Sequence, residues 1–160
     1  MTERSEALSA ADNALIVLSG KSGMTVGAQQ SYQKAKALNK PTAFFIGKLD
    51  SNHAHFYRVI SILTGLYGAV ICPIVVPYLE GETVKCYVDL INEKAYTFDG
   101  VKKTECYMPN SDEVNQMRDI MLEAVASMDE ELMEKYFEGE PFTYDEKITA
   151  IAKGIRTGEI

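Results

Sequence analysis

Two short, uninterrupted apolar segments separated by a helical pattern constrain the fold of this chain more than any other feature. Residues 14–19 and 42–46 are almost wholly apolar, which predicts strands that are buried on both faces. Residues 29–38 lie between them and have apolar side chains three apart, as on one side of a helix. Because parallel strands need a long, usually helical crossover, this order predicts parallel strands in an α/β sheet.

A second helix is predicted directly after the second strand. Residues 55–66 carry apolar side chains at the i, i+3, i+4 and i+7 spacing of a buried stripe. That stripe consists of Phe56, Val59, Ile60 and Leu63.

The next part of the chain favours short strands. Residues 70–76, 84–91 and 94–98 are the candidates, and Pro73 limits the first of them to a sheet edge or a first ladder position. Asn92-Glu93 separates the other two, and this spacing indicates a hairpin or a meander.

From residue 110 onwards the sequence pattern is helical. Asn110 or Ser111 is a suitable N-cap, and Thr143 with Glu146 forms a capping-box pattern before a last helix. The apolar stripes of these helices are predicted to be core: Val114, Met117, Met121, Val125 and Met128, then Ile148, Ile151, Ala152 and Ile155.

Charge and composition exclude some classes of function. The net charge is −7, and residues 111–160 carry 13 acidic against 5 basic side chains. An acidic surface repels phosphates, so direct DNA or RNA binding by that half is not expected. No apolar run approaches the ~18 residues of a membrane span, and the polar start is not a secretory signal. We expect a soluble, cytoplasmic protein.

The cysteines and histidines do not predict a metal site. Cys72, Cys86 and Cys106 lack C-x-x-C spacing, and two of them lie in apolar or strand-like runs, as small buried side chains do. His53 and His55 have no cysteine cluster nearby, so we expect no zinc.

Two loops follow the two parallel strands, at the edge of the sheet where ligands bind. Residues 19–23 contain Gly-Lys-Ser, but the glycine that a P-loop needs five positions earlier is Leu15, so we interpret this loop as an ordinary turn. Gly47-Lys48-Leu49-Asp50 is more informative. The carboxylate of Asp50 can accept hydrogen bonds from the ring N–H and amino group of guanine, and the stem of Lys48 can lie across the base. The Asn-Lys-X-Asp motif of GTPases selects guanine in this way.

Several short segments of the chain resemble those of a known protein family, and they occur in the same order as in that family. They lie at residues 11–19, 26–29, 41–50, 55–59, 73–77, 88–96, 131–140 and 153–160. As a set, they resemble the GTP-binding domain of elongation factor G, from the strand after its switch II helix to the segment before its last nucleotide motif. A stand-alone protein-interaction module derived from such a GTPase, or a ribosomal-protection-type relative, are the alternatives.

The resemblance implies a P-loop GTPase-type parallel sheet with helices and a small inserted α+β subdomain. Its implied division is 1–67 for the GTPase core, 68–145 for the inserted subdomain and 146–160 for a helix returning to the core. The implied ligand in the full-length protein is GTP or GDP. The P-loop, switch I and Asp-x-x-Gly elements, and with them the Mg²⁺ site, would lie upstream. The Ser-Ala base-contact loop would lie downstream.

No catalytic residue is therefore assigned, and this chain alone is not expected to hydrolyse GTP or to hold nucleotide firmly, because phosphoryl transfer needs phosphate cradling, Mg²⁺ and a positioned water. Gly47 departs from the family, which has Asn there. The lost hydrogen-bonding partner typically costs ~1–3 kcal/mol, so weaker nucleotide binding is expected. The implied partners are the ribosome and its acidic stalk protein, with the helix near 111–127 as the docking surface.

Overall fold

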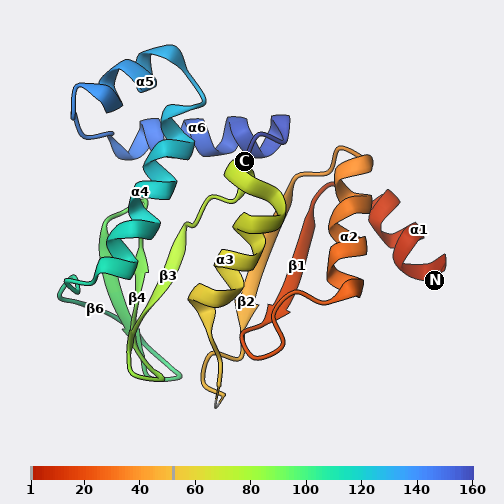
Figure 1. Cartoon of the computed structure of the whole chain (residues 1–160), viewed down its shortest axis with the longest axis horizontal. Helices are drawn as coiled ribbons and strands as arrows, with labels where there is room; N and C mark the ends of the chain where they lie inside the picture. The colour runs from red at the N-terminus through yellow and green to blue at the C-terminus, as the bar shows by residue number, and fades with distance from the viewer. Residues whose placement is uncertain (1, 52) are drawn as a thin grey trace.

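The computed structural model describes residues 2–51 and 53–160. Six helices, a short 3-10 turn and six strands follow one another in these residues, and Figure 1 shows them as two neighbouring groups. The first group contains α1 (Thr2–Ala10), β1 (Ala14–Ser19), α2 (Val26–Ala37), β2 (Thr42–Gly47) and α3 (Phe56–Tyr67). After η1 (Gly68–Val70), the second group contains β3 (Val75–Glu80), β4 (Thr83–Asp89), β5 (Lys94–Phe98), β6 (Lys103–Cys106), α4 (Asp112–Ala126), α5 (Glu130–Phe137) and α6 (Tyr144–Thr157).

The predicted parallel pair is confirmed, since β1 pairs with β2 in parallel from Ala14↔Thr42 to Ser19↔Gly47. The prediction of burial on both faces is wrong. Ile16 and Leu18 are buried among residues of α2 and α3, whereas Leu15 and Val17 on the opposite face are 67% and 66% exposed. Both helices cover the same face of this two-stranded sheet, so its other face is bare.

Helix α2 begins three residues earlier than predicted. The side chain of Thr25 caps it by accepting a hydrogen bond from the backbone N–H of Ala28. Helix α3 follows the predicted stripe closely, with all four predicted side chains buried. Helix α1 carries no apolar stripe and was not predicted.

The second group is built on an antiparallel sheet in the order β3-β4-β5-β6. The predicted strand at 70–76 is wrong in position, because residues 71–74 form no ladder and β3 begins at Val75. Its proline is Pro77, which the edge position of β3 permits. The hairpin between β4 and β5 is confirmed, while β6 was not predicted.

Helix α4 packs on one face of the antiparallel sheet (Figure 1). Ser111 is its N-cap, and all five side chains of its predicted stripe are buried. The capping box of Thr143 and Glu146 at the start of α6 is also confirmed. One stripe residue is misplaced, since Ile148 is 39% exposed. The side chain that α6 buries one position earlier is Lys147, whose Nζ pairs with Glu93 Oε1 at 3.0 Å.

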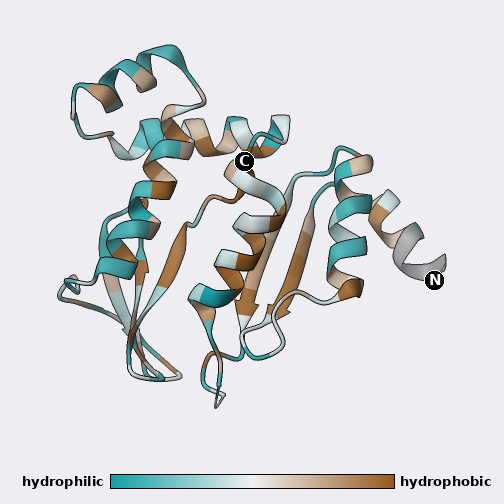
Figure 2. Ribbon diagram, viewed as in Figure 1, coloured by the Kyte–Doolittle hydropathy of each residue, from teal (hydrophilic) through white to brown (hydrophobic). Residues whose placement is uncertain are grey.

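The two groups share one apolar core, in which buried residues of β1, α3, the antiparallel sheet and α4 are contiguous. Figure 2 shows apolar colouring on both sheets and on the inward side of α3. The hydroxyl of Tyr57 in α3 donates a 2.6 Å hydrogen bond to the carbonyl oxygen of Pro77 in β3. Leu90 N–H donates to Ile74 O at 2.9 Å, which attaches the segment after α3 to the β4–β5 turn.

Candidate functional site

Both loops that the sequence singled out lie at the carboxyl end of the parallel pair. The parallel register ends at Ser19↔Gly47, so the turn after β1 and the loop after β2 leave the sheet side by side. This edge is where ligands of open α/β sheets bind. The structure therefore brings residues 19–23 and 47–50 together, as the strand order predicted.

The first loop is a tight turn that leads into α2. Gly23 N–H donates to Ser19 O at 2.7 Å, and Gly23 has a φ of 64°, a backbone conformation that glycine adopts without strain. Lys21 is exposed on the outside of this turn. The interpretation of Gly-Lys-Ser as an ordinary strand–helix turn is consistent with this geometry.

The second loop holds Lys48 and Asp50 outward and Leu49 inward. Both charged residues are exposed, whereas Leu49 is half-buried and packs against the core. Lys48 has a φ of 56°, which is uncommon for a residue with a side chain and is often found at functional sites. Residues 48–51 close a turn through the Ser51 N–H, which donates to Lys48 O at 3.4 Å. Contact of Lys48 and Asp50 with a base stays a prediction.

Nothing in the backbone requires glycine at position 47. Gly47 is absent from the positive-φ positions among the described residues. A Cβ built at this position would lie 3.2 Å from Phe45 Cε1, which is slightly tight. Because the Phe45 side chain is 57% exposed, its ring can move away. An asparagine, the residue of the family motif, therefore fits here.

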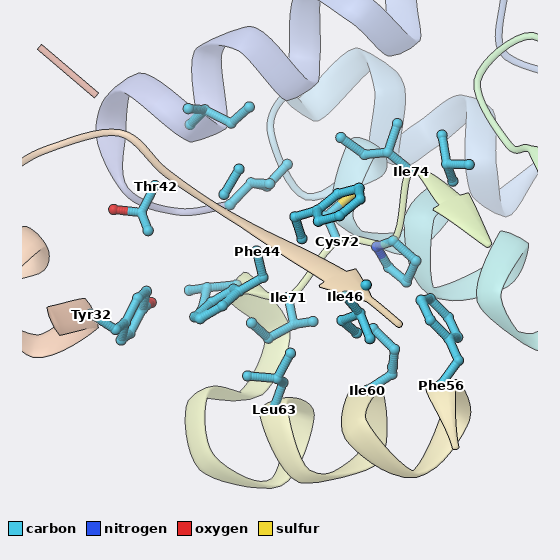
Figure 3. A pocket seen from close by; sticks show the side chains of 18 of the residues that line it. Tyr32, Thr42, Phe44, Ile46, Phe56, Ile60, Leu63, Ile71, Cys72 and Ile74 are labelled. Carbon is cyan, nitrogen blue, oxygen red and sulfur yellow. The ribbon is translucent and has the colours of Figure 1, made fainter. Parts of the chain in front are cut away.

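A groove along the open side of β2 was not foreseen from the sequence. Its cavity volume is about 770 Å³, and it runs between β2, α3, the 70–77 segment and the end of α6. Figure 3 shows its apolar floor, with Phe44, Ile46, Leu63 and Ile71 pointing into one space. Within the described residues, β2 has a strand partner on one side only. No local sequence signal indicated this groove, because its walls come from segments that are far apart in the chain.

The thiol of Cys86 is buried, as the sequence predicted, whereas Cys72 and Cys106 are half-buried. Burial raises the pKa of Cys72 to about 12, and burial followed by the neighbouring Cys106 raises the pKa of Cys86 to about 11. A thiol in this state is a poor metal ligand and a poor nucleophile. The described part of the chain holds no cluster of three or more potential metal ligands. Across residues 2–51 and 53–160, no helix is long and apolar enough to span a membrane.

The comparisons with known proteins agree with this architecture, although no family model matches the chain. The chain is 34% identical over 149 residues to the elongation factor G-like protein of Thermotoga maritima, which covers 93% of this chain and 22% of that protein. It superimposes on a crystal structure of a protein from Thermus thermophilus with a TM-score of 0.83 and 32% identity. That match covers 98% of this chain and 24% of the other.

The fold defines the class as an α/β protein that carries an additional antiparallel unit. The sequence then gives the relationship: over 93% of its own length, the chain is related to an elongation factor G-like protein. It spans less than a quarter of the length of each of the two relatives.

Proposed function

We propose that this chain forms part of the GTP-binding domain of a translational GTPase that acts on the ribosome, in the cytoplasm, during elongation. In the whole protein, Lys48 and Asp50 contact the guanine base, and Gly47 occupies the first position of the motif. The observation that carries the proposal is the position of the Gly47–Asp50 loop, at the carboxyl end of a parallel strand, in a chain related over 93% of its length to an elongation factor G-like protein.

The exposed apolar face and the open edge of the parallel pair support this proposal. Leu15, Val17 and Phe45 lie on one face and are each more than half exposed, and β2 has an open edge beside a large apolar groove. A stable α/β sheet covers such surfaces. In the proposed GTPase, other parts of the whole protein complete the sheet and supply the P-loop, switch I, Asp-x-x-Gly and Mg²⁺. The 160 residues alone then hydrolyse no GTP.

Nucleotide binding by the whole protein tests this proposal. Wild-type protein is expected to bind GDP, and Asp50→Ala is expected to weaken GDP binding by about tenfold to 100-fold, because a charged hydrogen-bond acceptor is worth about 1.5–3 kcal/mol. Gly47→Asn is expected to tighten binding. Lys21→Ala, in the neighbouring turn, is the matched control and should change little. GTP turnover by the clean 160-residue chain, lost in Asp50→Ala, would overturn the proposal.

The proposed partner of the second group is the ribosomal stalk protein. This proposal rests on the resemblance to elongation factor G alone, because the exposed acidic side chains of α4 do not attract an acidic protein: Asp112, Glu113, Asp119 and Glu123. The test is a titration with the C-terminal domain of the stalk protein at millimolar concentration, followed by NMR. Shifts are expected for α4 residues, and their absence would remove this partner from the proposal.

A stand-alone interaction module is the second candidate function, favoured by Gly47 in place of asparagine. The reading frame that encodes this chain separates the candidates. An upstream G-x-x-x-x-G-K-[ST] motif supports the GTPase. A native start at Met1 and a stop after Ile160 would support the module, and nucleotide chemistry would then be dropped.

A further inference from the structure

The turn after β1 and the loop after β2 are joined through a single residue, Gly20. Its backbone N–H donates a 2.8 Å hydrogen bond to Gly47 O, and its carbonyl oxygen accepts a 2.9 Å hydrogen bond from His55 N–H. Gly47 and His55 are the two ends of the loop that contains Lys48 and Asp50. The same backbone unit therefore fixes the start and the end of this loop.

Gly20 is also pressed against the inside of the loop. A Cβ at this position would lie 2.8 Å from Leu49 Cδ2, 3.3 Å from Ala54 Cβ and 3.4 Å from Gly47 O. A contact under 3.0 Å forces something to move, and here it is the end of the Leu49 side chain, between Lys48 and Asp50, that must shift, because the Ala54 Cβ and the Gly47 carbonyl are fixed to the backbone. Gly20 is buried, so a new side chain cannot turn away into solvent.

We propose that Gly20 is a positioning residue for the Gly47–Asp50 loop: its two hydrogen bonds and its missing side chain allow Leu49 to anchor the loop and to hold Lys48 and Asp50 outward. The inference rests on the proposed function, because that function assigns guanine binding to this loop. In this arrangement the Leu49 side chain anchors the loop against the core. The anchor fixes the positions of Lys48 and Asp50, the exposed charged residues on either side of it.

The first experiment measures amide hydrogen exchange in the 160-residue chain. Gly20→Ala is expected to speed exchange at the amides of residues 20 and 55 and to leave the amide of the fully buried Met121 in α4 unchanged. Gly65→Ala is the matched control, since a Cβ there meets nothing within 4 Å. Unchanged exchange at residues 20 and 55, or equal acceleration throughout the chain, would overturn the inference.

The second experiment uses the whole protein and compares the Kd values of GDP and IDP, which lacks the 2-amino group of guanine. Gly20→Ala is expected to reduce the preference for GDP roughly tenfold, because small displacements of positioning groups have large effects. Gly65→Ala should keep the preference. A general loss of stability would lower the active fraction and leave the ratio of the two Kd values unchanged.

A double-mutant cycle assigns the effect to Leu49. Gly20→Ala is expected to change the GDP preference less when Leu49→Ala is already present, because the 2.8 Å clash is then removed. Additive effects would overturn this part of the inference. If wild-type protein binds no guanine nucleotide, the proposed function fails, and hydrogen exchange still decides whether Gly20 positions the loop. If wild-type protein prefers GDP and Gly20→Ala keeps that preference, only the inference fails.

Discussion

The two sheets of this chain differ in the side chains that they carry on the face that no helix covers. In the antiparallel sheet, charged and aromatic side chains on this face interact with one another: Lys94 Nζ lies 3.0 Å from Glu105 Oε2, and Lys103 Nζ lies 3.6 Å from the centre of the Tyr96 ring. In the parallel pair, the uncovered face carries the apolar side chains of Leu15 and Val17, which are about two-thirds exposed. Both sheets are therefore covered by helices on one face, but only the parallel pair leaves a wholly apolar face open.

The first group therefore leaves the larger apolar surface in contact with water. Apolar side chains stabilise a fold by about 25 cal/mol per Å² only where water is removed from them. The exposed face of β1 and β2 contributes little in the isolated chain, and the groove beside β2 leaves further apolar surface uncovered. The second group fixes its own helices through caps and ion pairs.

The largest expected effect contrasts one leucine from each group. Leu90 is 1% exposed and Leu15 is 67% exposed. Leu90→Ala is expected to lower the free energy of unfolding by about 2–5 kcal/mol, because it leaves a cavity in the core. Leu15→Ala is expected to change it by less than about 0.5 kcal/mol. Urea unfolding followed by circular dichroism measures both.

A similar loss for both leucines would contradict this difference between the two groups. It would mean that the bare face of β1 is covered in solution, for example by a second copy of the chain. Sedimentation at several protein concentrations would then distinguish self-association from a rearranged fold.

The ion pair between α6 and the β4–β5 turn gives the next largest effect. The Lys147 side chain is 4% exposed and pairs with Glu93, whose side chain is 55% exposed. Glu93→Ala leaves a buried ammonium without this partner and is expected to cost about 1–3 kcal/mol in unfolding free energy. Adding Lys147→Met should restore most of that loss in the same denaturation assay. If the double variant stays as unstable as Glu93→Ala, the pair does not hold α6 to the sheet.

The sequence predicted elements that carry a local signal. The stripe of α3, the N-cap Ser111 and the Thr143–Glu146 box each lie within a few neighbouring residues, and all were confirmed. Strand β6 was missed because Lys103-Thr-Glu-Cys106 lies at a sheet edge and lacks apolar alternation.

Features that depend on distant segments could not be predicted in the same way. The exposure of Leu15 depends on whether other protein covers β1, and no local pattern records that. In the candidate site, the loop position followed from the strand order. The role of Gly20 did not, because it depends on contacts with Leu49 and Ala54, about thirty residues further along the chain.

A smaller effect is expected at the junction of the two groups. The hydroxyl of Tyr57 donates a hydrogen bond to the buried Pro77 carbonyl, and Tyr57→Phe is expected to cost about 0.5–1.5 kcal/mol. Tyr107→Phe, at a side chain that is 99% exposed, is the control and should cost nothing measurable. Thermal unfolding of both variants makes the comparison. A zero effect at Tyr57 would mean that this contact does not couple the groups.

The same tyrosine should make the free energy of unfolding depend on pH in the alkaline range. Burial, followed by the charge of Glu113, raises the pKa of Tyr57 from 10.0 to about 12. Because the folded state favours the neutral phenol, this contribution is complete below pH 10 and is lost as the pH rises towards 12. Tyr57→Phe should therefore flatten the stability curve in that range.

The smallest expected effect lies in acid and concerns the helices of the second group. The backbone N–H of Thr143 is the main cause that lowers the pKa of Glu146 from 4.5 to about 2, and Lys135 adds to it. Because the folded-state pKa is the lower one, this contribution is present above pH 4.5 and is lost as the pH falls towards 2. Protection factors for hydrogen exchange in α6, which correct for the pH dependence of intrinsic exchange, should therefore fall over this range before those in β1 do.

Glu146→Gln tests the origin of this acid sensitivity, because glutamine keeps an acceptor for the Thr143 N–H but cannot titrate. The variant should begin with faster α6 exchange at neutral pH, since the ion pair with Lys135 is lost. Its protection factors should then change little between pH 4.5 and 2. Glu140→Gln, at an exposed glutamate just before the cap, should keep the wild-type profile. If Glu146→Gln keeps it as well, the capping box does not set the acid response, and α6 is held by its packing and by Lys147.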